Sequence, residues 1–111
     1  ERISKLELFK NSPNELINII SQNMVHELYI SNETIINEDC LNDKMYLLIQ
    51  GIAHGTSGDR SGRIFIDGST WSKQALIDES WIEPGTIVSN TNCHIYTLSR
   101  NDFIDIITSK Q

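Results

Sequence analysis

The sequence predicts a mainly β domain with flanking α-helices: an antiparallel β-roll, jelly-roll-like, of about eight short strands. Three observations predict it. The chain has 111 residues, the size of one domain. At 39% hydrophobic and 22% charged it can bury a core. Apolar residues alternate with polar ones through the middle of the chain, and recur at helical spacing near both ends. We expect one domain over residues 1–111, part of a larger protein.

The N-terminal part predicts helical structure. Apolar residues at positions 3, 6, 8 and 9 favour a short amphipathic helix or turn. The stretch from Ser12 to Glu15 is a helix start, because Ser12 can cap, Pro13 can take the first position and Glu15 can close a capping box. Apolar residues at 16, 17, 20 and 24 then predict a helix over about residues 13–23.

The middle of the chain predicts strands separated by turns. Residues 39–44 are polar and turn-like, with Asn42 a candidate for the left-handed conformation. Residues 57–62 read as an exposed hairpin loop, residues 67–68 as a turn, and residues 83–85 as a break. The predicted strands are Val25–Ile30, Thr34–Ile36, Met45–Gln50, Arg63–Ile66, Thr86–Ser89 and Cys93–Leu98.

Two further helical segments complete the expected order. Residues 71–76 favour a helical turn inside the strand region. Ser99 and Asp102 form a second capping-box-like start, and apolar residues at 103, 104, 106 and 107 supply one face of a last helix.

Charge and composition exclude several classes of function. Nine basic against 15 acidic side chains give a net charge of −6, which argues against a nonspecific nucleic-acid partner. No apolar run approaches the roughly 18 residues of a membrane span. Cys40 and Cys93 are expected as buried or half-buried free thiols. The scattered histidines form no metal-ligand pattern, and no nucleophile–base arrangement predicts an enzyme. We therefore expect neither a metal nor catalysis.

Five segments in this order resemble the cyclic-nucleotide-binding domain family, over residues 6 to about 107. Residues 8, 9 and 16 look like its opening helix. Residues 35–39 and 43–51 resemble its strand–turn–strand signature, which ends in Gly51. Asp67-Gly68 stands where the family turns into its phosphate-binding cassette, and Ala75-Leu76 matches the cassette's Ala-Leu pair. Residues 91–99 with Phe103 resemble the final strand and following helix.

The closing segment looks most like the domains attached to ion channels, among them hyperpolarisation-activated and cyclic-nucleotide-gated channels, and related exchangers. The resemblance implies a regulatory module of a cation channel or related membrane transporter, on the cytoplasmic face. Its partners would be the rest of the parent protein, a membrane or effector domain, in a tetramer or dimer. The family's lid helix would begin or continue near Gln111.

The cassette departs from the family pattern of Phe-Gly-Glu, followed later by Arg and then Thr, Ser or Ala. Trp71-Ser72-Lys73 replaces the first motif. Counting back from the closing strand, Glu83 stands at the Arg position and Pro84 at the next. The resemblance therefore implies a degenerate ligand pocket at Trp71, Ser72, Lys73, Ala75, Leu76, Glu83, Pro84 and Gly85.

These replacements predict weak or absent binding of cyclic AMP and cyclic GMP, and no other cofactor. Lys73 cannot accept a hydrogen bond from ribose. Glu83 would repel the phosphate by about 1–4 kcal/mol, and the lost Arg contact forfeits about 1.5–3 kcal/mol. Together these costs lower the affinity by at least about a hundredfold.

Three alternatives stay open at this point. The register at Glu83 can slip, so that Arg60, Arg63 or Lys73 enters the pocket and the domain works as a cAMP or cGMP sensor of a channel or a cyclic-nucleotide-dependent kinase. A peptide segment of the same protein can fill the pocket beside Trp71 and Trp81, as in ether-à-go-go-type channels; otherwise both tryptophans pack in the core or rim. An unrelated β-barrel enzyme is the third alternative.

Overall fold

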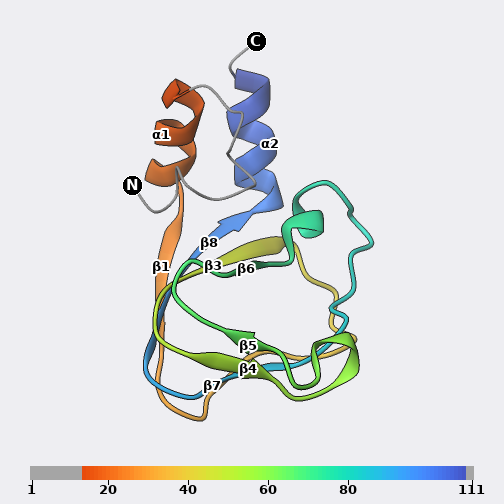
Figure 1. Cartoon of the computed structure of the whole chain (residues 1–111). Helices are drawn as coiled ribbons and strands as arrows, with labels where there is room; N and C mark the ends of the chain where they lie inside the picture. Colours follow the sequence, from red (N-terminus) through yellow and green to blue (C-terminus); the bar gives the residue numbers. More distant parts are fainter. Residues whose placement is uncertain (1–13, 110–111) are drawn as a thin grey trace.

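A computed structural model describes residues 14–109 as two packed β-sheets with two helices at one end (Figure 1). None of the helices in these residues is long and apolar enough to cross a bilayer. The elements in chain order are α1 (Asn14–Gln22), β1 (Val25–Tyr29), β2 (Thr34–Ile36), β3 (Lys44–Gln50), β4 (Ala53–Gly55), the 3-10 helix η3 (Gly58–Arg60), β5 (Ile64–Phe65), β6 (Thr70–Trp71), the 3-10 helix η4 (Lys73–Leu76), β7 (Ile87–Ser89), β8 (Cys93–Ser99) and α2 (Arg100–Ser109).

The eight strands form two four-stranded antiparallel sheets. One has the order β1-β8-β3-β6 and the other the order β2-β7-β4-β5. In the first, Val25 pairs with Thr97 and Met45 with Leu98. In the second, Ala53 pairs with Ser89. The consecutive strands β7 and β8 each lie inside a different sheet, so the chain crosses between the sheets as a β-roll requires. The predicted fold class is confirmed.

Strand β3 contributes to both parts of the apolar core because its side chains alternate between its two faces. Tyr46 and Leu48 pack between the sheets, whereas Met45 and Leu47 pack under the helices. The inter-sheet cluster is Ile35, Ile36, Tyr46, Leu48, Ala53, Phe65, Trp71, Ile87, Cys93 and Ile95. The cluster under the helices is Ile20, Met45, Leu47, Leu76, Leu98 and Ile106.

Helices α1 and α2 lie side by side over the end of the first sheet (Figure 1). The structure confirms the first helix close to the predicted residues 13–23, and the predicted start of the last helix. There the Asp102 N–H donates to Ser99 Oγ at 3.1 Å, capping α2. The amphipathic segment predicted at residues 3–9 and the capping residues Ser12 and Pro13 lie outside the described residues.

The strand predictions hold for the long strands and are incomplete for the short ones. The sequence pattern did not predict β4 or β6, and β5 is shorter than the expected strand Arg63–Ile66. Two residue-level predictions are wrong. Asp39, with φ 66°, takes the left-handed conformation expected of Asn42. Cys40 is exposed rather than buried, while Cys93 is buried as expected; both thiols are free.

Candidate ligand pocket and its buried ion pair

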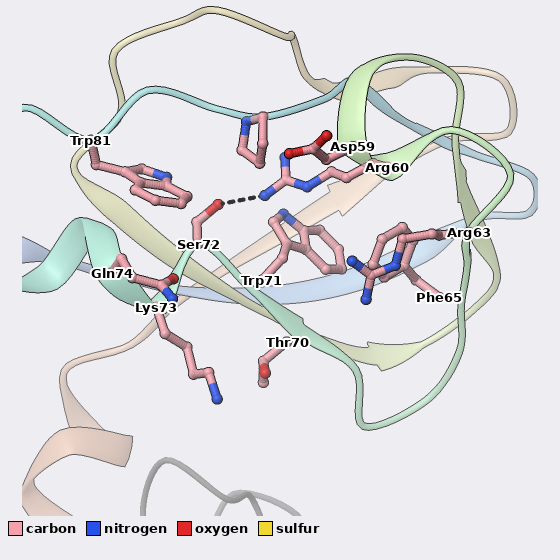
Figure 2. Close-up of a pocket in the computed structure, with 11 residues that line it drawn as sticks. Asp59, Arg60, Arg63, Phe65, Thr70, Trp71, Ser72, Lys73, Gln74 and Trp81 are labelled. Atoms are coloured by element: carbon pink, nitrogen blue, oxygen red, sulfur yellow. Dashed lines mark hydrogen bonds between the residues drawn. The ribbon is translucent and has the colours of Figure 1, made fainter.

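A pocket of about 210 Å³ lies beside the segment that the resemblance identifies as the cassette (Figure 2). It opens between β6 with η4 on one side and the loop that carries η3 on the other. The lining residues are Asp59, Arg60, Arg63, Phe65, Thr70, Trp71, Ser72, Lys73, Gln74, Trp81 and Pro84.

Ser72 holds the backbone turn that leads into η4. Its φ of 66° and ψ of 30° place it in the left-handed region, which favours the glycine of the family motif. The side chain is buried, and its hydroxyl lies 2.9 and 2.8 Å from the two carboxylate oxygens of Glu83. The serine therefore takes a backbone conformation that glycine adopts without strain, and adds a contact that glycine cannot make.

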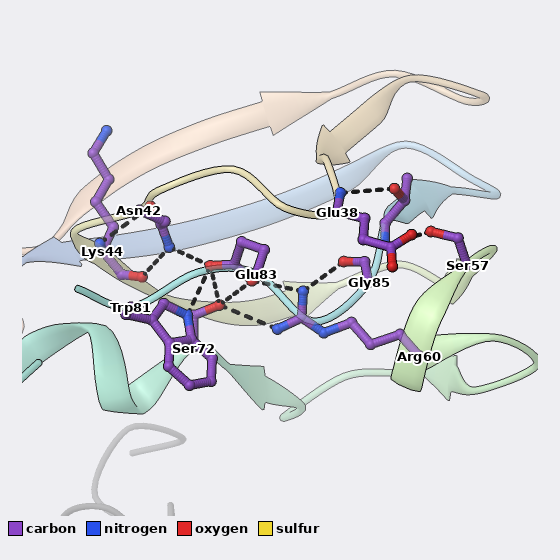
Figure 3. Close-up of polar contacts among 10 residues, drawn as sticks. Glu38, Asn42, Lys44, Ser57, Arg60, Ser72, Trp81, Glu83 and Gly85 are labelled. Atoms are coloured by element: carbon purple, nitrogen blue, oxygen red, sulfur yellow. Dashed lines mark hydrogen bonds and ion pairs between the residues drawn. The ribbon is translucent and has the colours of Figure 1, made fainter.

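Glu83 is fully buried and is surrounded by hydrogen-bond donors (Figure 3). Arg60 Nη1 lies 2.6 Å from Glu83 Oε1, and Asn42 Nδ2 lies 2.6 Å from Oε2. Trp81 Nε1 also donates to Oε2, at 3.0 Å. With the Ser72 hydroxyl, four side chains thus satisfy one carboxylate, as a buried charge requires.

Arg60 is the cation of this buried cluster and is 4% exposed. It ends η3, and its Nη1 also donates to the Gly85 carbonyl at 2.8 Å. The close approach of the two chain segments requires glycine at position 85. A Cβ atom there would lie 2.3 Å from the Ser57 carbonyl oxygen and 2.8 Å from Arg60 Cβ. The backbone at Gly85 and the buried arginine therefore depend on each other.

The structure divides the eight predicted site residues into three groups. Four of them, Trp71, Ser72, Lys73 and Pro84, line the pocket. Ala75 and Leu76 are buried in η4, beneath it. Glu83 and Gly85 do not line the pocket and instead hold Arg60.

Arg60, Arg63 and Lys73, the cations considered as replacements for the missing arginine, all line the pocket. Arg60 is already paired with Glu83, so its charge neutralises the carboxylate. From the sequence, this carboxylate was expected to repel a phosphate. The sequence missed this pair and the contact from Asn42. The only sequence signal was that Arg60 is one of three cations expected to enter the pocket if the register at Glu83 slips.

Aromatic side chains form one wall of the pocket. Trp71 stacks on Tyr46, with ring centroids 5.6 Å apart, and meets Phe65 edge-to-face at 5.2 Å. Arg63 lies over the Phe65 ring, 5.6 Å from its centroid. Trp71 is a core residue and Trp81 is partly buried at the rim, as predicted.

Trp71 Nε1 is buried and makes no hydrogen bond with any residue that the structure describes. The neighbouring Tyr46 has its pKa raised to about 12, first because burial disfavours the phenolate and then because the carboxylates of Glu27 and Glu83 lie near it. Trp71 therefore carries an unused donor in the aromatic wall, and Tyr46, stacked on it, stays neutral over a wide pH range.

The histidines make local contacts on strands rather than a metal site. His26 and His94 share a hydrogen bond of 2.9 Å between ring nitrogens, and His54 bonds to Asn90 at 2.6 Å. Within residues 14–109, no group of three or more His, Cys, Asp or Glu side chains is arranged to hold a metal ion.

No family model and no curated protein matches this sequence. Solved structures do match. A cyclic nucleotide-binding-like protein from Brucella abortus aligns with a TM-score of 0.85 at 17% identity, over 96% of this chain and 95% of that chain. The regulatory domain of Toxoplasma gondii PKA, in a co-crystal structure with cAMP, aligns with a TM-score of 0.81 at 17% identity. That match covers 97% of this chain and 43% of the other. The chain therefore has the fold of the cyclic-nucleotide-binding domains.

Proposed function

We propose that the chain is a regulatory module of cyclic-nucleotide-binding type in which nucleotide binding is weak or absent. The reason is that its own Glu83 forms an ion pair with the buried Arg60. The parent would be a cation channel or related membrane transporter, as a tetramer or dimer, with this module on the cytoplasmic face. The module would act through contacts with the rest of that protein. The observation that carries the proposal is the 2.6 Å ion pair between Arg60 and Glu83.

Among the residues that the structure describes, the ion pair leaves no free buried cation in the pocket for a phosphate. Arg60 Nη1 is committed to Glu83 and to the Gly85 carbonyl, and Nη2 reaches Ser72 Oγ at 3.3 Å. A phosphate would have to displace the Glu83 carboxylate from Arg60. Hydrogen bonds from Asn42, Ser72 and Trp81 also hold that carboxylate in place. Because burying an unpaired charge costs several kcal/mol, Glu83 cannot give up Arg60 cheaply.

Two further features disfavour a nucleotide. Lys73 replaces the acidic residue that holds ribose in the resembled family, and an ammonium group accepts no hydrogen bonds. The pocket volume of about 210 Å³ is also below the roughly 300–1,000 Å³ typical of small-molecule sites. Both features act independently of the ion pair.

Arg100 supplies a route by which the pocket can act on its surroundings. It is the first residue of α2, and its guanidinium donates to the carbonyls of Ala75, in η4, at 2.6 Å and of Asp78 at 2.9 Å. A displacement of the cassette would therefore change the contacts at the start of α2. A helix that responds in this way can bias a neighbouring domain between two states.

Calorimetric titration with cAMP and cGMP tests the proposal. The native domain is expected to show no binding in the micromolar range, and micromolar affinity for either nucleotide would overturn the proposal. The variant Arg60→Gln/Lys73→Glu/Glu83→Arg places the family's cation and ribose acceptor at their positions and removes the competing arginine. It is expected to gain nucleotide affinity relative to the native domain.

A matched control separates local from general charge effects. Glu79→Arg reverses a charge on an exposed residue of the same connecting segment, so it should leave nucleotide affinity unchanged. If Glu79→Arg gains as much affinity as the triple variant, the gain reflects net charge alone and the assignment of Glu83 is wrong.

A second candidate is a working cAMP or cGMP sensor, of a channel or of a cyclic-nucleotide-dependent kinase. Arg63 and Lys73 favour it, because both line the pocket and neither side chain forms an ion pair with another described residue. These exposed or half-exposed cations are weaker phosphate anchors than a buried arginine. Micromolar binding in the same titration would support this candidate.

A further inference from the structure

Trp71 Nε1 is a buried donor on the wall of a pocket, and the structure describes no acceptor for it. The side chain is 4% exposed and is fixed by its contacts with Tyr46 and Phe65. Figure 2 shows its ring nitrogen on the side that faces the Arg60 guanidinium and Ser72. Leaving a buried donor without a partner is unfavourable, so an acceptor placed there is favoured.

The charges around the pocket favour an acceptor with one negative charge. Arg60, Arg63 and Lys73 line it, opposed by Asp59 on the wall and by Glu83 beneath. One positive charge therefore remains uncompensated, in a chain whose net charge is −6. A monoanion would neutralise the pocket, whereas a dianion would leave an excess negative charge in it.

The shape and walls of the pocket favour a small planar ligand. Phe65, Trp71 and Trp81 supply aromatic surface, and the Arg63 guanidinium lies over Phe65. Aromatic rings prefer stacked or edge-to-face neighbours. The volume of about 210 Å³ suits a molecule with one ring better than a nucleotide with base, ribose and phosphate.

We propose that the pocket binds a small aromatic monocarboxylate, whose carboxylate reaches Trp71 Nε1 as the lining side chains move apart and accepts a hydrogen bond from it, and whose ring packs against Phe65 and Trp81. The inference rests on the proposed function, because a pocket that held a cyclic nucleotide would leave no room for this ligand. Trp71 is then a ligand-binding residue rather than only a core aromatic residue.

Sodium benzoate is the probe that tests this inference, with nitrogen-15 NMR of the intact domain as the readout. The chain has two tryptophans, so its two indole N–H signals are separate reporters. Benzoate is expected to shift the Trp71 indole signal saturably. Cyclohexanecarboxylate, which keeps the charge but lacks a planar ring, should bind about two- to tenfold more weakly. Acetate should bind more weakly again.

Variants assign the contacts. Trp71→Phe keeps an aromatic ring and removes the donor, so benzoate affinity should fall about ten- to a hundredfold. Lys73→Gln should also weaken binding, while Lys44→Gln, which removes a lysine outside the pocket, should leave it unchanged. Unchanged affinity in a folded Trp71→Phe variant would overturn the assigned donor.

The native domain alone decides the main point. If millimolar benzoate shifts neither indole signal, the inference is wrong, even when Trp71→Phe fails to fold. Parallel titration with cAMP keeps the two proposals apart. When neither compound binds, the proposed function stands and this inference fails; when cAMP alone binds tightly, both fail.

Discussion

Two ion pairs in this chain each join a glutamate to a basic side chain, in very different surroundings. Arg60 and Glu83 approach to 2.6 Å, with side chains 5% and 0% exposed. Lys44 and Glu27 are 3.9 Å apart, with side chains 42% and 27% exposed. Ser72, Trp81 and Asn42 supply three further donors to the first pair, whereas Glu27 in the second accepts one, from the Tyr29 hydroxyl.

The comparison shows what burial does to a charge. On the surface, water solvates each partner when the pair opens, so little depends on the contact. In the interior, removing one partner leaves the other as an unpaired buried charge, which is strongly unfavourable. The side chains that bond to the pair are therefore held in one arrangement. Arg60 is consequently held in place by Glu83, and under the proposed function this is why the fold binds a cyclic nucleotide weakly or not at all.

The largest expected effect comes from removing one buried partner. Arg60→Met leaves the Glu83 carboxylate buried without its cation, and should lower the free energy of unfolding by about 3–5 kcal/mol. Urea denaturation followed by circular dichroism measures it. Lys44→Met is the matched control, and an equal loss in both variants would contradict the distinction between the two pairs.

Alkaline pH should destabilise the fold through Tyr46, which packs beside the buried pair. Its pKa is raised to about 12 in the folded state by burial and by the carboxylates of Glu27 and Glu83, against about 10 when unfolded. The stabilisation is complete below pH 10 and is lost as pH rises to about 12. It amounts to roughly 2–3 kcal/mol, at about 1.4 kcal/mol per pKa unit.

Urea denaturation at a series of alkaline pH values, with tyrosinate absorbance recorded in parallel, measures this effect. Tyr29 contributes in the same direction, because burial and its hydrogen bond to Glu27 also raise its pKa. Tyr46→Phe should remove part of the pH dependence. Ionisation of Tyr46 near pH 10 in the folded protein would show that it is solvated.

A smaller effect is expected at Trp81, whose Nε1 donates to Glu83 Oε2 at 3.0 Å. Trp81→Phe should cost about 1.5–3 kcal/mol, the range for a hydrogen bond to a charged group. Thermal and urea unfolding measure the loss. In an Arg60→Met/Glu83→Leu background the acceptor is gone, so the same substitution should cost clearly less; an undiminished cost would mean that Trp81 stabilises through packing alone.

The smallest effect is expected at the exposed pair. Lys44→Met or Glu27→Gln should change the free energy of unfolding by less than about 1 kcal/mol. This change in the free energy of unfolding should be smaller still at about 1 M salt, where the screening length is about 3 Å. A salt-insensitive loss of several kcal/mol would place this pair in the same class as the buried one.

The sequence was sufficient to predict the architecture, because long elements carry a periodic pattern. Strand β3 alternates between two apolar clusters, and Ser99 with Asp102 starts α2 as a capping residue does. Strands β4 and β6 have three and two residues, too few to show a period of two. Their pairing is decided by tertiary contacts.

The candidate site includes side-chain contacts that the sequence did not predict. The resemblance assigns Trp71 to Lys73 and Pro84 to the cassette, and these residues line a pocket. It could not show that Glu83 turns inward to Arg60, 23 residues earlier in the chain. Local patterns carry no information about which distant side chain satisfies a buried charge, because that choice depends on how the loops pack.

A double-mutant cycle tests the central claim, that Glu83 is the fixed counter-ion of Arg60. The free energy of unfolding is measured for the native domain, Arg60→Met, Glu83→Leu and the double variant. Each single variant should lose about 3–5 kcal/mol, and the double variant far less than the sum, because no charge is then left buried alone. Losses that add to within about 0.5 kcal/mol would show that the two residues act independently, and would contradict the claim.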